Sequence, residues 1–182
     1  MRRVGLGATV TMATLLVVAA CGGGDGSLAT TLGGGGEPAS GTLVQGDAYR
    51  GVLLDAHLDY MRPADGETIE DVDSFVPTPD DVERFEAQLP AAVDTAANPG
   101  GDDVAADDLD GYVRQYTGVA AATSGRDDRH LVVAAICDSA AENGIEWQRG
   151  WVEVADGGTC FWDATMDLGS GEILRFGFHG SA

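Results

Sequence analysis

The chain has 182 residues, of which 30 are acidic and 10 basic, so that its formal net charge is −20. Every basic residue is an arginine, and lysine is absent. A field this negative disfavours nucleic acid and anionic membrane surfaces as direct partners, whereas it attracts cations or a basic protein. The simpler interpretation of the charge is solubility in a salty or cation-rich exterior.

Residues 1–20 have the pattern of a secretory signal peptide. Arg2 and Arg3 supply the positive start, and an uncharged stretch follows over residues 4–20. The tetrapeptide Val18-Ala19-Ala20-Cys21 resembles the lipobox of bacterial lipoproteins. That resemblance implies cleavage before Cys21 and a diacylglycerol on its sulfur, so that the protein is anchored by lipid in the cell envelope with its domain outside the cytoplasm. Two alternatives are an ordinary signal peptide cut elsewhere and a retained membrane helix, for which this stretch is at the lower length limit.

A glycine-rich segment follows the cysteine. Eight of the fifteen residues from 22 to 36 are glycine, a density that predicts a flexible spacer. We therefore expect a lipidated tether over residues 21–45 and one folded domain over residues 46–182, which is long enough to bury a core. The glycines are not a phosphate-binding loop, because no Gly-Lys-Ser/Thr follows them.

The first element predicted in the domain is a helix at about residues 78–90. Before it, a short apolar run at residues 52–54 fits either a strand or a helix, and residues 63–73 read as a polar loop. Thr78 is a good N-cap and Pro79 suits the first helical position. Pro90 is expected to end or kink the helix. The apolar stripe of this helix is Val82, Phe85 and Leu89.

An acidic loop at residues 94–111, with room for one helical turn at 104–109, separates the helix from strand-like sequence. Five runs have β-branched and aromatic residues between turn signals. They are residues 112–121, 130–137, 147–154, 160–168 and 172–179. One helix followed by five closely connected strands predicts an α+β fold, with the helix packed on a mainly antiparallel five-stranded sheet.

Alternation along the last three runs predicts which residues face the helix. The expected core positions are Val152, Val154, Trp162, Ala164, Met166, Leu168, Leu174, Phe176 and Phe178. The opposite face mixes arginines, carboxylates and aromatic rings, and we expect a ligand- or protein-binding surface there, carried by Arg149, Trp151, Arg175 and His179. The alternative is a solvated sheet face with cross-strand ion pairs.

Cys137 and Cys160 are an even pair in an exported domain, which favours a disulfide. A plain meander of the five strands opposes it, because Cys137 ends the second strand and Cys160 begins the fourth, whereas bridged cysteines need Cα atoms within about 7 Å. Either the strand order differs from a meander, or residues 138–147 double back.

No motif specifies a reaction, a metal or a cofactor. His57, His130 and His179 are not spaced as metal ligands, and Gly-x-Ser-x-Gly is absent. The acidic run at residues 101–111 lacks the spacing of a calcium loop. We therefore expect no cofactor and a non-enzymatic accessory or binding domain, whose partner is another envelope protein or a basic partner. The alternatives are a structural role in envelope maintenance and a hydrolase with an unrecognised site.

Residues 75–182 resemble a widespread group of uncharacterised small exported bacterial proteins and lipoproteins. The resemblance is carried by the run Tyr112-Val113-Arg114-Gln115-Tyr116, by the turn Asp156-Gly157-Gly158 before Thr159-Cys160-Phe161, and by the ending His179-Gly180-Ser181-Ala182. His179 stands where the group usually has asparagine. The resemblance implies an exported domain and supplies no catalytic residue.

Overall fold

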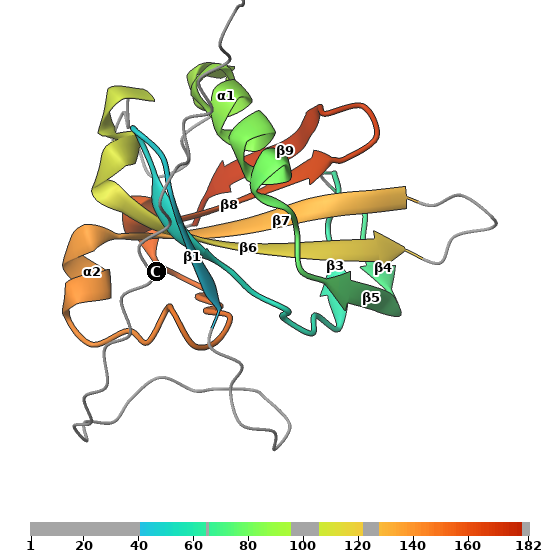
Figure 1. The fold of residues 1–182 in the computed structure, drawn as a ribbon, viewed down its shortest axis with the longest axis horizontal. Coiled ribbons are helices and arrows are strands. Elements are labelled where there is room, and N and C mark those ends of the chain that lie inside the picture. The colour runs from blue at the N-terminus through green and yellow to red at the C-terminus, as the bar shows by residue number, and fades with distance from the viewer. Residues whose placement is uncertain (1–40, 65, 96–105, 122–127, 180–182) are drawn as a thin grey trace, which may run out of the picture.

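The computed structural model describes residues 41–64, 66–95, 106–121 and 128–179 (Figure 1). Cys21, the signal sequence and most of the expected tether lie outside these ranges. Within them, no helix combines the length and the apolar character needed to cross a membrane.

A seven-stranded mixed sheet organises the domain (Figure 1). Four long neighbours, all antiparallel, are β6 (Tyr112–Ala121), β7 (Asp128–Cys137), β8 (Phe161–Asp167) and β9 (Ile173–Phe178). The other edge of β6 is shared by two short strands. β2 (Arg50–Leu53) pairs parallel with its first half, and β5 (Val72–Phe75) pairs antiparallel with its second half. β1 (Thr42–Gln45) adds to β2, and β3 (Tyr60–Met61) with β4 (Ile69–Glu70) forms a separate two-stranded sheet.

The predicted α+β fold, with one helix on a mainly antiparallel five-stranded sheet, is therefore wrong. The domain is mostly β, its main sheet is mixed, and three strands of that sheet, β1, β2 and β5, precede the principal helix in the sequence. β1 lies within the residues assigned to the tether. Residues 147–154 form no strand, although their sequence alternates as a strand would. Because residues 147–154 form no strand between them, β7 and β8 pair directly with each other.

The principal helix, α1 (Pro79–Thr95), begins where the sequence indicates but runs past Pro90. Its start is a reciprocal cap: the Asp81 N–H donates to Thr78 Oγ1 at 3.2 Å, and the Thr78 N–H donates to Asp81 Oδ2 at 3.0 Å. Pro90 has no N–H for the carbonyl of Glu86, which weakens the helix at this point. Burial of Leu89 before the proline and of Val93 after it offsets that loss.

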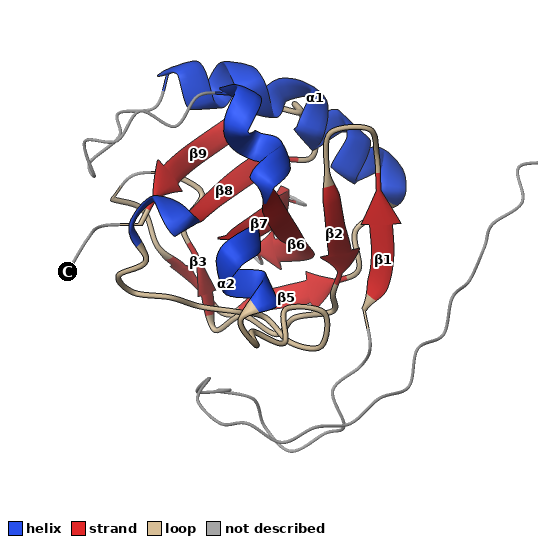
Figure 2. Ribbon diagram, turned by 90° about the vertical axis from the view of Figure 1, so that its left-hand side faces the viewer, coloured by secondary structure: helices blue, strands red, loops and turns tan. Residues whose placement is uncertain are grey.

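The main core lies between α1 and one face of the sheet (Figure 2). Val82, Phe85, Leu89 and Val93 of α1 pack against alternate residues of the central strands, and the predicted core residues Trp162, Ala164 and Met166 are fully buried. Phe176 is only half-buried, with its ring centroid 5.3 Å from that of Trp162. Leu174 is exposed, contrary to expectation, because a register shift between Thr165 and Met166 pairs Met166 with Ile173.

Irregular chain fastens to the opposite face of the sheet through polar side chains. The Gln115 amide donates to the carbonyls of Trp147 and Gly150 at 2.5 and 2.6 Å, and its oxygen accepts the Val152 N–H at 2.8 Å. Thr165 Oγ1 similarly donates to the carbonyl of Arg62 at 3.2 Å. Residues 147–152 thus satisfy their backbone through a side chain of β6 rather than through a neighbouring strand, so Val152 and Val154 do not join the main core.

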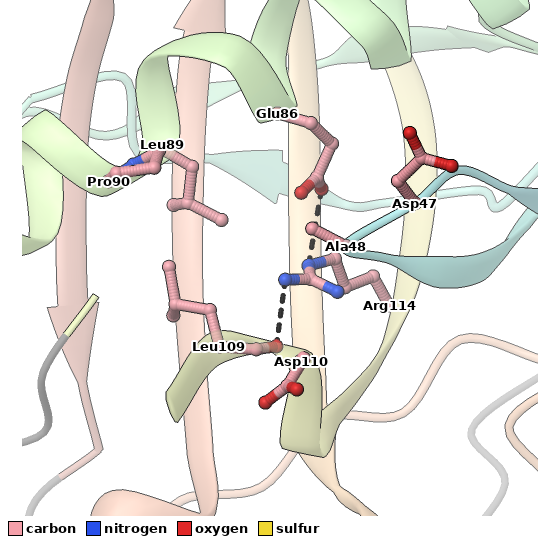
Figure 3. Close-up of a pocket in the computed structure, with 8 residues that line it drawn as sticks. All are labelled: Asp47, Ala48, Glu86, Leu89, Pro90, Leu109, Asp110 and Arg114. Atoms are coloured by element: carbon pink, nitrogen blue, oxygen red, sulfur yellow. Dashed lines mark hydrogen bonds and ion pairs between the residues drawn. The ribbon is translucent and has the colours of Figure 1, made fainter. Parts of the chain in front are cut away.

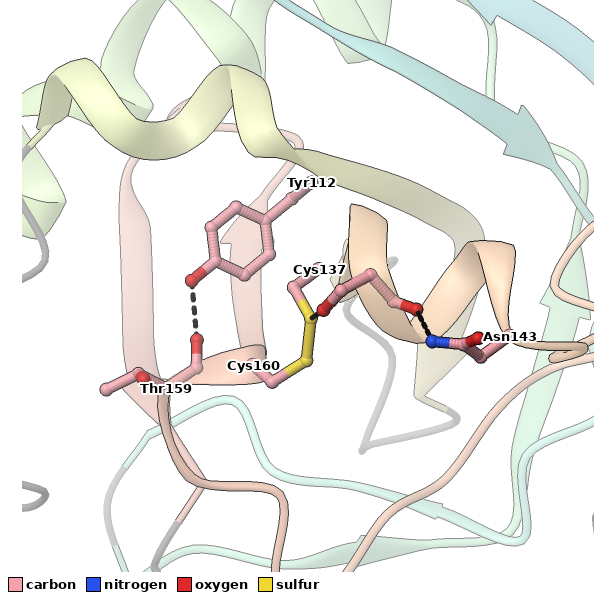
Figure 4. The surroundings of a disulfide bond; sticks show 6 residues. Tyr112, Cys137, Asn143, Thr159 and Cys160 are labelled. Atoms are coloured by element: carbon pink, nitrogen blue, oxygen red, sulfur yellow. Dashed lines mark hydrogen bonds between the residues drawn. A yellow bond between two sulfur atoms is a disulfide. The ribbon is translucent and has the colours of Figure 1, made fainter.

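Cys137 and Cys160 form a disulfide with their Cα atoms 4.8 Å apart (Figure 4). The pairing of Ile136 with Phe161 places the two cysteines opposite each other at the ends of β7 and β8. The meander that opposed this bond is absent, because the intervening chain forms the short helix α2 (Asp138–Glu142) and irregular structure instead of a strand. Beside the bond, the Tyr112 hydroxyl donates to the carbonyl of Thr159 at 2.5 Å.

Candidate functional site

A pocket of about 310 Å³ opens where α1, the 3₁₀ helix η1 (Ala106–Gly111) and the turn between β1 and β2 meet (Figure 3). Its described lining residues are Asp47, Ala48, Glu86, Leu89, Pro90, Leu109, Asp110 and Arg114. In Figure 3, Glu86 and Arg114 face each other, Asp47 lies to one side of them and Asp110 lies below. Four elements, the β1–β2 turn, α1, η1 and β6, therefore bring three carboxylates and one guanidinium to a single small space.

Arg114 is the most buried charge of the site, with only 1% of its side chain exposed. The alternation of β6 points it toward α1, between Tyr112 and Tyr116. Its Nε lies 3.2 Å from Glu86 Oε1, an ion pair whose angle does not make a hydrogen bond. Its Nη2 donates to the carbonyl of Leu109 at 2.9 Å and its Nη1 to that of Tyr112 at 3.3 Å. Both Nη atoms are thus hydrogen-bonded, and the charge is compensated by Glu86, whereas Nε is buried beside a carboxylate without a hydrogen bond.

Glu86 projects from α1 onto this guanidinium, and 10% of its side chain is exposed. The Tyr116 hydroxyl donates to its Oε1 at 2.7 Å. Burial raises the pKa of Glu86, and the Arg114 charge and the Tyr116 hydrogen bond oppose that rise only in part. Burial, together with the Glu86 charge, also raises the pKa of Tyr116 well above its usual value, so its hydroxyl remains a donor.

The rim and the walls differ in character. Asp47 and Asp110 are exposed at the mouth, whereas Leu89, Pro90 and Leu109 supply apolar surface. A second hollow of about 140 Å³ adjoins the first and continues along the β1–β2 turn. It shares Asp47, Ala48 and Asp110 with the pocket and adds Gln45, Gly46, Tyr49 and Arg50. Because they share these residues, the two hollows form one groove, which is lined by the carboxylates of Asp47, Glu86 and Asp110 and by the guanidiniums of Arg50 and Arg114.

The residues of the predicted binding face do not form one surface on a strand. Arg149 lies in irregular chain, where its guanidinium reaches Glu146 at 3.5 Å and 58% of its side chain is exposed. Trp151 is half-buried and packs with Trp147 on a small apolar cluster that contains Val52. The prediction is wrong for both residues, because the segment that contains them pairs with no strand and so presents no strand face.

Arg175 and His179, in contrast, do lie together on the face opposite α1. Arg175 forms an ion pair with Asp163, and the His179 Nε2 lies 3.3 Å from the same carboxylate. Burial lowers the pKa of His179, the Arg175 charge adds to this effect, and a hydrogen bond with the backbone of Val154 opposes it. Such a carboxylate shared between two bases matches the alternative interpretation of this face, cross-strand ion pairing.

Glu86 and Arg114 were absent from the sequence-based candidates. Arg114 could have been singled out, because a charge stands between two tyrosines on one face of an otherwise apolar strand. Glu86 lies among the many carboxylates of the chain, and only the packing of α1 on β6 distinguishes it. In the described part of the chain, no group of three or more His, Cys, Asp or Glu side chains is placed so that it could hold a metal ion.

Comparison with protein families, with curated proteins and with solved structures finds no match to this chain. Its function therefore has to be argued from its own residues.

Proposed function

We propose that this protein is a lipid-anchored lipoprotein of the bacterial cell envelope whose folded domain binds a partner and catalyses no reaction. The anchor rests on the sequence Val18-Ala19-Ala20-Cys21 after an apolar stretch. The disulfide between Cys137 and Cys160 supports export, because such bonds persist in oxidising compartments. The acidic pocket is the binding site in this proposal.

The observation that carries the binding role is the Glu86 carboxylate, which is nine-tenths buried and yet lines an open pocket. Burying a carboxylate costs free energy, because the group loses its hydration. A carboxylate that is buried beside an open pocket is therefore a candidate for contacting a bound partner. The described lining residues include no serine, threonine, cysteine or histidine that could act as a nucleophile. Arg114 and Tyr116 hold the carboxylate in place, which suits binding better than proton transfer.

The anchor is tested by intact mass measurement and palmitate labelling of the full-length protein. We expect Cys21 to be the acylated N-terminus and Cys21→Ser to abolish both the label and the membrane association. An unmodified N-terminus at any other residue would contradict the anchor.

The binding role is tested by placing a photo-reactive phenylalanine analogue at Ala48, an exposed pocket residue, in the native envelope. The matched control places the analogue at Tyr60, which is also exposed but lies on the small separate sheet. We expect a discrete adduct from position 48 that position 60 does not give. Identical adducts from both positions, or none from position 48, would contradict a partner at the pocket.

A further inference from the structure

We propose that the acidic pocket receives the cationic side chain of a lysine or arginine from a basic partner protein. The inference rests on the proposed binding function and names the chemistry that the site recognises. It is drawn from four features of the pocket: its charge balance, a carboxylate oxygen that accepts no hydrogen bond from the described residues, its apolar wall and its extension along the β1–β2 turn.

The charge balance of the lining favours a cation. Asp47, Glu86 and Asp110 oppose a single guanidinium, that of Arg114. The nitrogens of Arg114 already lie against Glu86 and two backbone carbonyls, and its guanidinium carbon lies 5.8 Å from the centre of the Trp162 ring. An anionic ligand would have to pass the two carboxylates of the rim to reach a guanidinium whose acceptors are in place. A cation, in contrast, is attracted by the same carboxylates.

The Glu86 carboxylate offers a specific acceptor at the deep end. Its contacts with Arg114 and Tyr116 both use Oε1. Among the described residues, no hydrogen bond reaches Oε2. A carboxylate oxygen in this position is a strong acceptor for an ammonium or guanidinium donor, because charge-assisted hydrogen bonds strengthen where water is scarce.

The wall and the size of the pocket fit a long side chain. Leu89, Pro90 and Leu109 line it with apolar atoms, which match the aliphatic stem of lysine or arginine below its charged head. A volume of about 310 Å³ is at the small end of ligand pockets, which favours one side chain over a larger molecule.

The adjoining hollow argues for a protein rather than a free amine. It continues from the pocket along the β1–β2 turn and shares Asp47, Ala48 and Asp110 with it. Residues flanking an inserted lysine or arginine would lie in this extension. The net charge of −20 would also steer a basic protein toward the domain and accelerate encounter.

The decisive measurement is the affinity of full-length protein in detergent for a fluorescent peptide with one lysine among glycines and serines. The test variant is D47N/D110N, which removes both rim charges. The control, D59N/D156N, removes two exposed carboxylates outside the pocket and therefore changes the net charge by the same amount as the test variant. We expect D47N/D110N to weaken binding about tenfold, the size of one lost charge-assisted contact, and the control to leave it nearly unchanged. Acetylation of the peptide lysine should abolish binding.

Equal weakening by the two double variants would show attraction by the overall field alone and overturn the inference. So would undiminished binding of the acetylated peptide. Displacement of the peptide by an equal concentration of butylamine would assign the pocket to free amines and overturn the choice of a protein. If the adduct at position 48 persists in the envelope while the lysine peptide fails to bind, the partner is real and the cationic chemistry is wrong. If both fail, the binding function fails with it.

The absence of lysine from this chain gives a second test in the native envelope. A water-soluble carbodiimide joins a carboxylate to a neighbouring amine, and this protein has no lysine amine of its own to consume it. Adducts mapped to Asp47 or Asp110 would support a lysine of the partner at the rim. Adducts confined to carboxylates outside the groove, such as Asp59, would contradict it.

Discussion

The ion pair between Glu86 and Arg114 joins α1 to β6 through charge inside a largely apolar interface. Removing one partner of a buried pair is costly, because the remaining charge stays desolvated without compensation. We predict that Glu86→Gln lowers the free energy of unfolding by about 3 kcal/mol, although glutamine can still accept the Tyr116 hydroxyl. Urea denaturation measures the change.

The matched control for this variant is Glu83→Gln, which makes the same substitution one turn earlier on α1 at an exposed position. We expect the control to change stability by less than about 0.5 kcal/mol. Equal losses from the two variants would show that helix charge, rather than the contact with Arg114, explains the effect.

We predict that His179 makes the stability of the fold depend on pH. Its pKa in the folded protein is lower than its ordinary value of 6.5, mainly because of burial. The unfolded chain therefore binds a proton at a higher pH than the folded protein does. The stabilisation is complete above pH 6.5 and is lost as the pH falls through the lowered pKa.

The measurement is urea denaturation of the wild type and of His179→Asn at about pH 7.5 and about pH 5.5, on either side of the ordinary histidine pKa. We expect the wild type to lose more stability than the variant between the two values. Asparagine is close in size to histidine and carries no ionisable group, so it removes the titration with little change in volume. Parallel pH profiles would contradict a role for His179.

At the scale of elements, β6 is the strand to which both layers attach. Its alternation sends Tyr112, Arg114 and Tyr116 toward α1 and sends Gln115 to the irregular chain on the other face. Residues 112–116 therefore hold α1 on one face of the sheet and irregular chain on the other. Gln115 uses both ends of its amide, with two donated bonds and one accepted bond.

We predict that Gln115→Met lowers the free energy of unfolding by about 3 kcal/mol, because the backbone groups of Trp147, Gly150 and Val152 lose their partner. Methionine keeps most of the side-chain length and isolates the loss of hydrogen bonds from the loss of volume. Gln45→Met, at an exposed position of β1, is the control and should be nearly neutral. A loss below about 1 kcal/mol would mean that water replaces the amide without penalty.

The sequence predicted the long strands β6 to β9 well because each has an apolar, β-branched run between clear turn signals. It missed β1 and β5, which have four residues each and carry polar positions that read as linker or loop. It also wrongly predicted a strand at residues 147–154. Apolar and polar residues do alternate there, but the backbone of this segment is hydrogen-bonded by the Gln115 side chain instead of a neighbouring strand. The site could not be found locally, because Glu86, Arg114 and Asp47 meet only through the packing of three separate elements.

On the scale of the whole molecule, the sheet is covered on both faces, by α1 on one and by irregular chain on the other. The disulfide and Gln115 both hold the chain between β7 and β8, the first at its ends and the second at its middle. They can stabilise the fold in different ways. Hydrogen bonds of Gln115 exist only in the folded protein, whereas a disulfide acts mainly by restricting the unfolded chain.

We predict that Cys137→Ser/Cys160→Ser lowers the free energy of unfolding by about 3 kcal/mol, the value expected for a closed loop of this length. If the bond acts on the unfolded chain, its loss should add to that of Gln115→Met within about 0.5 kcal/mol in the combined variant. Urea denaturation of the two variants and their combination completes the cycle. A combined loss that departs clearly from the sum would show instead that the disulfide positions residues 147–152 against Gln115 in the folded state.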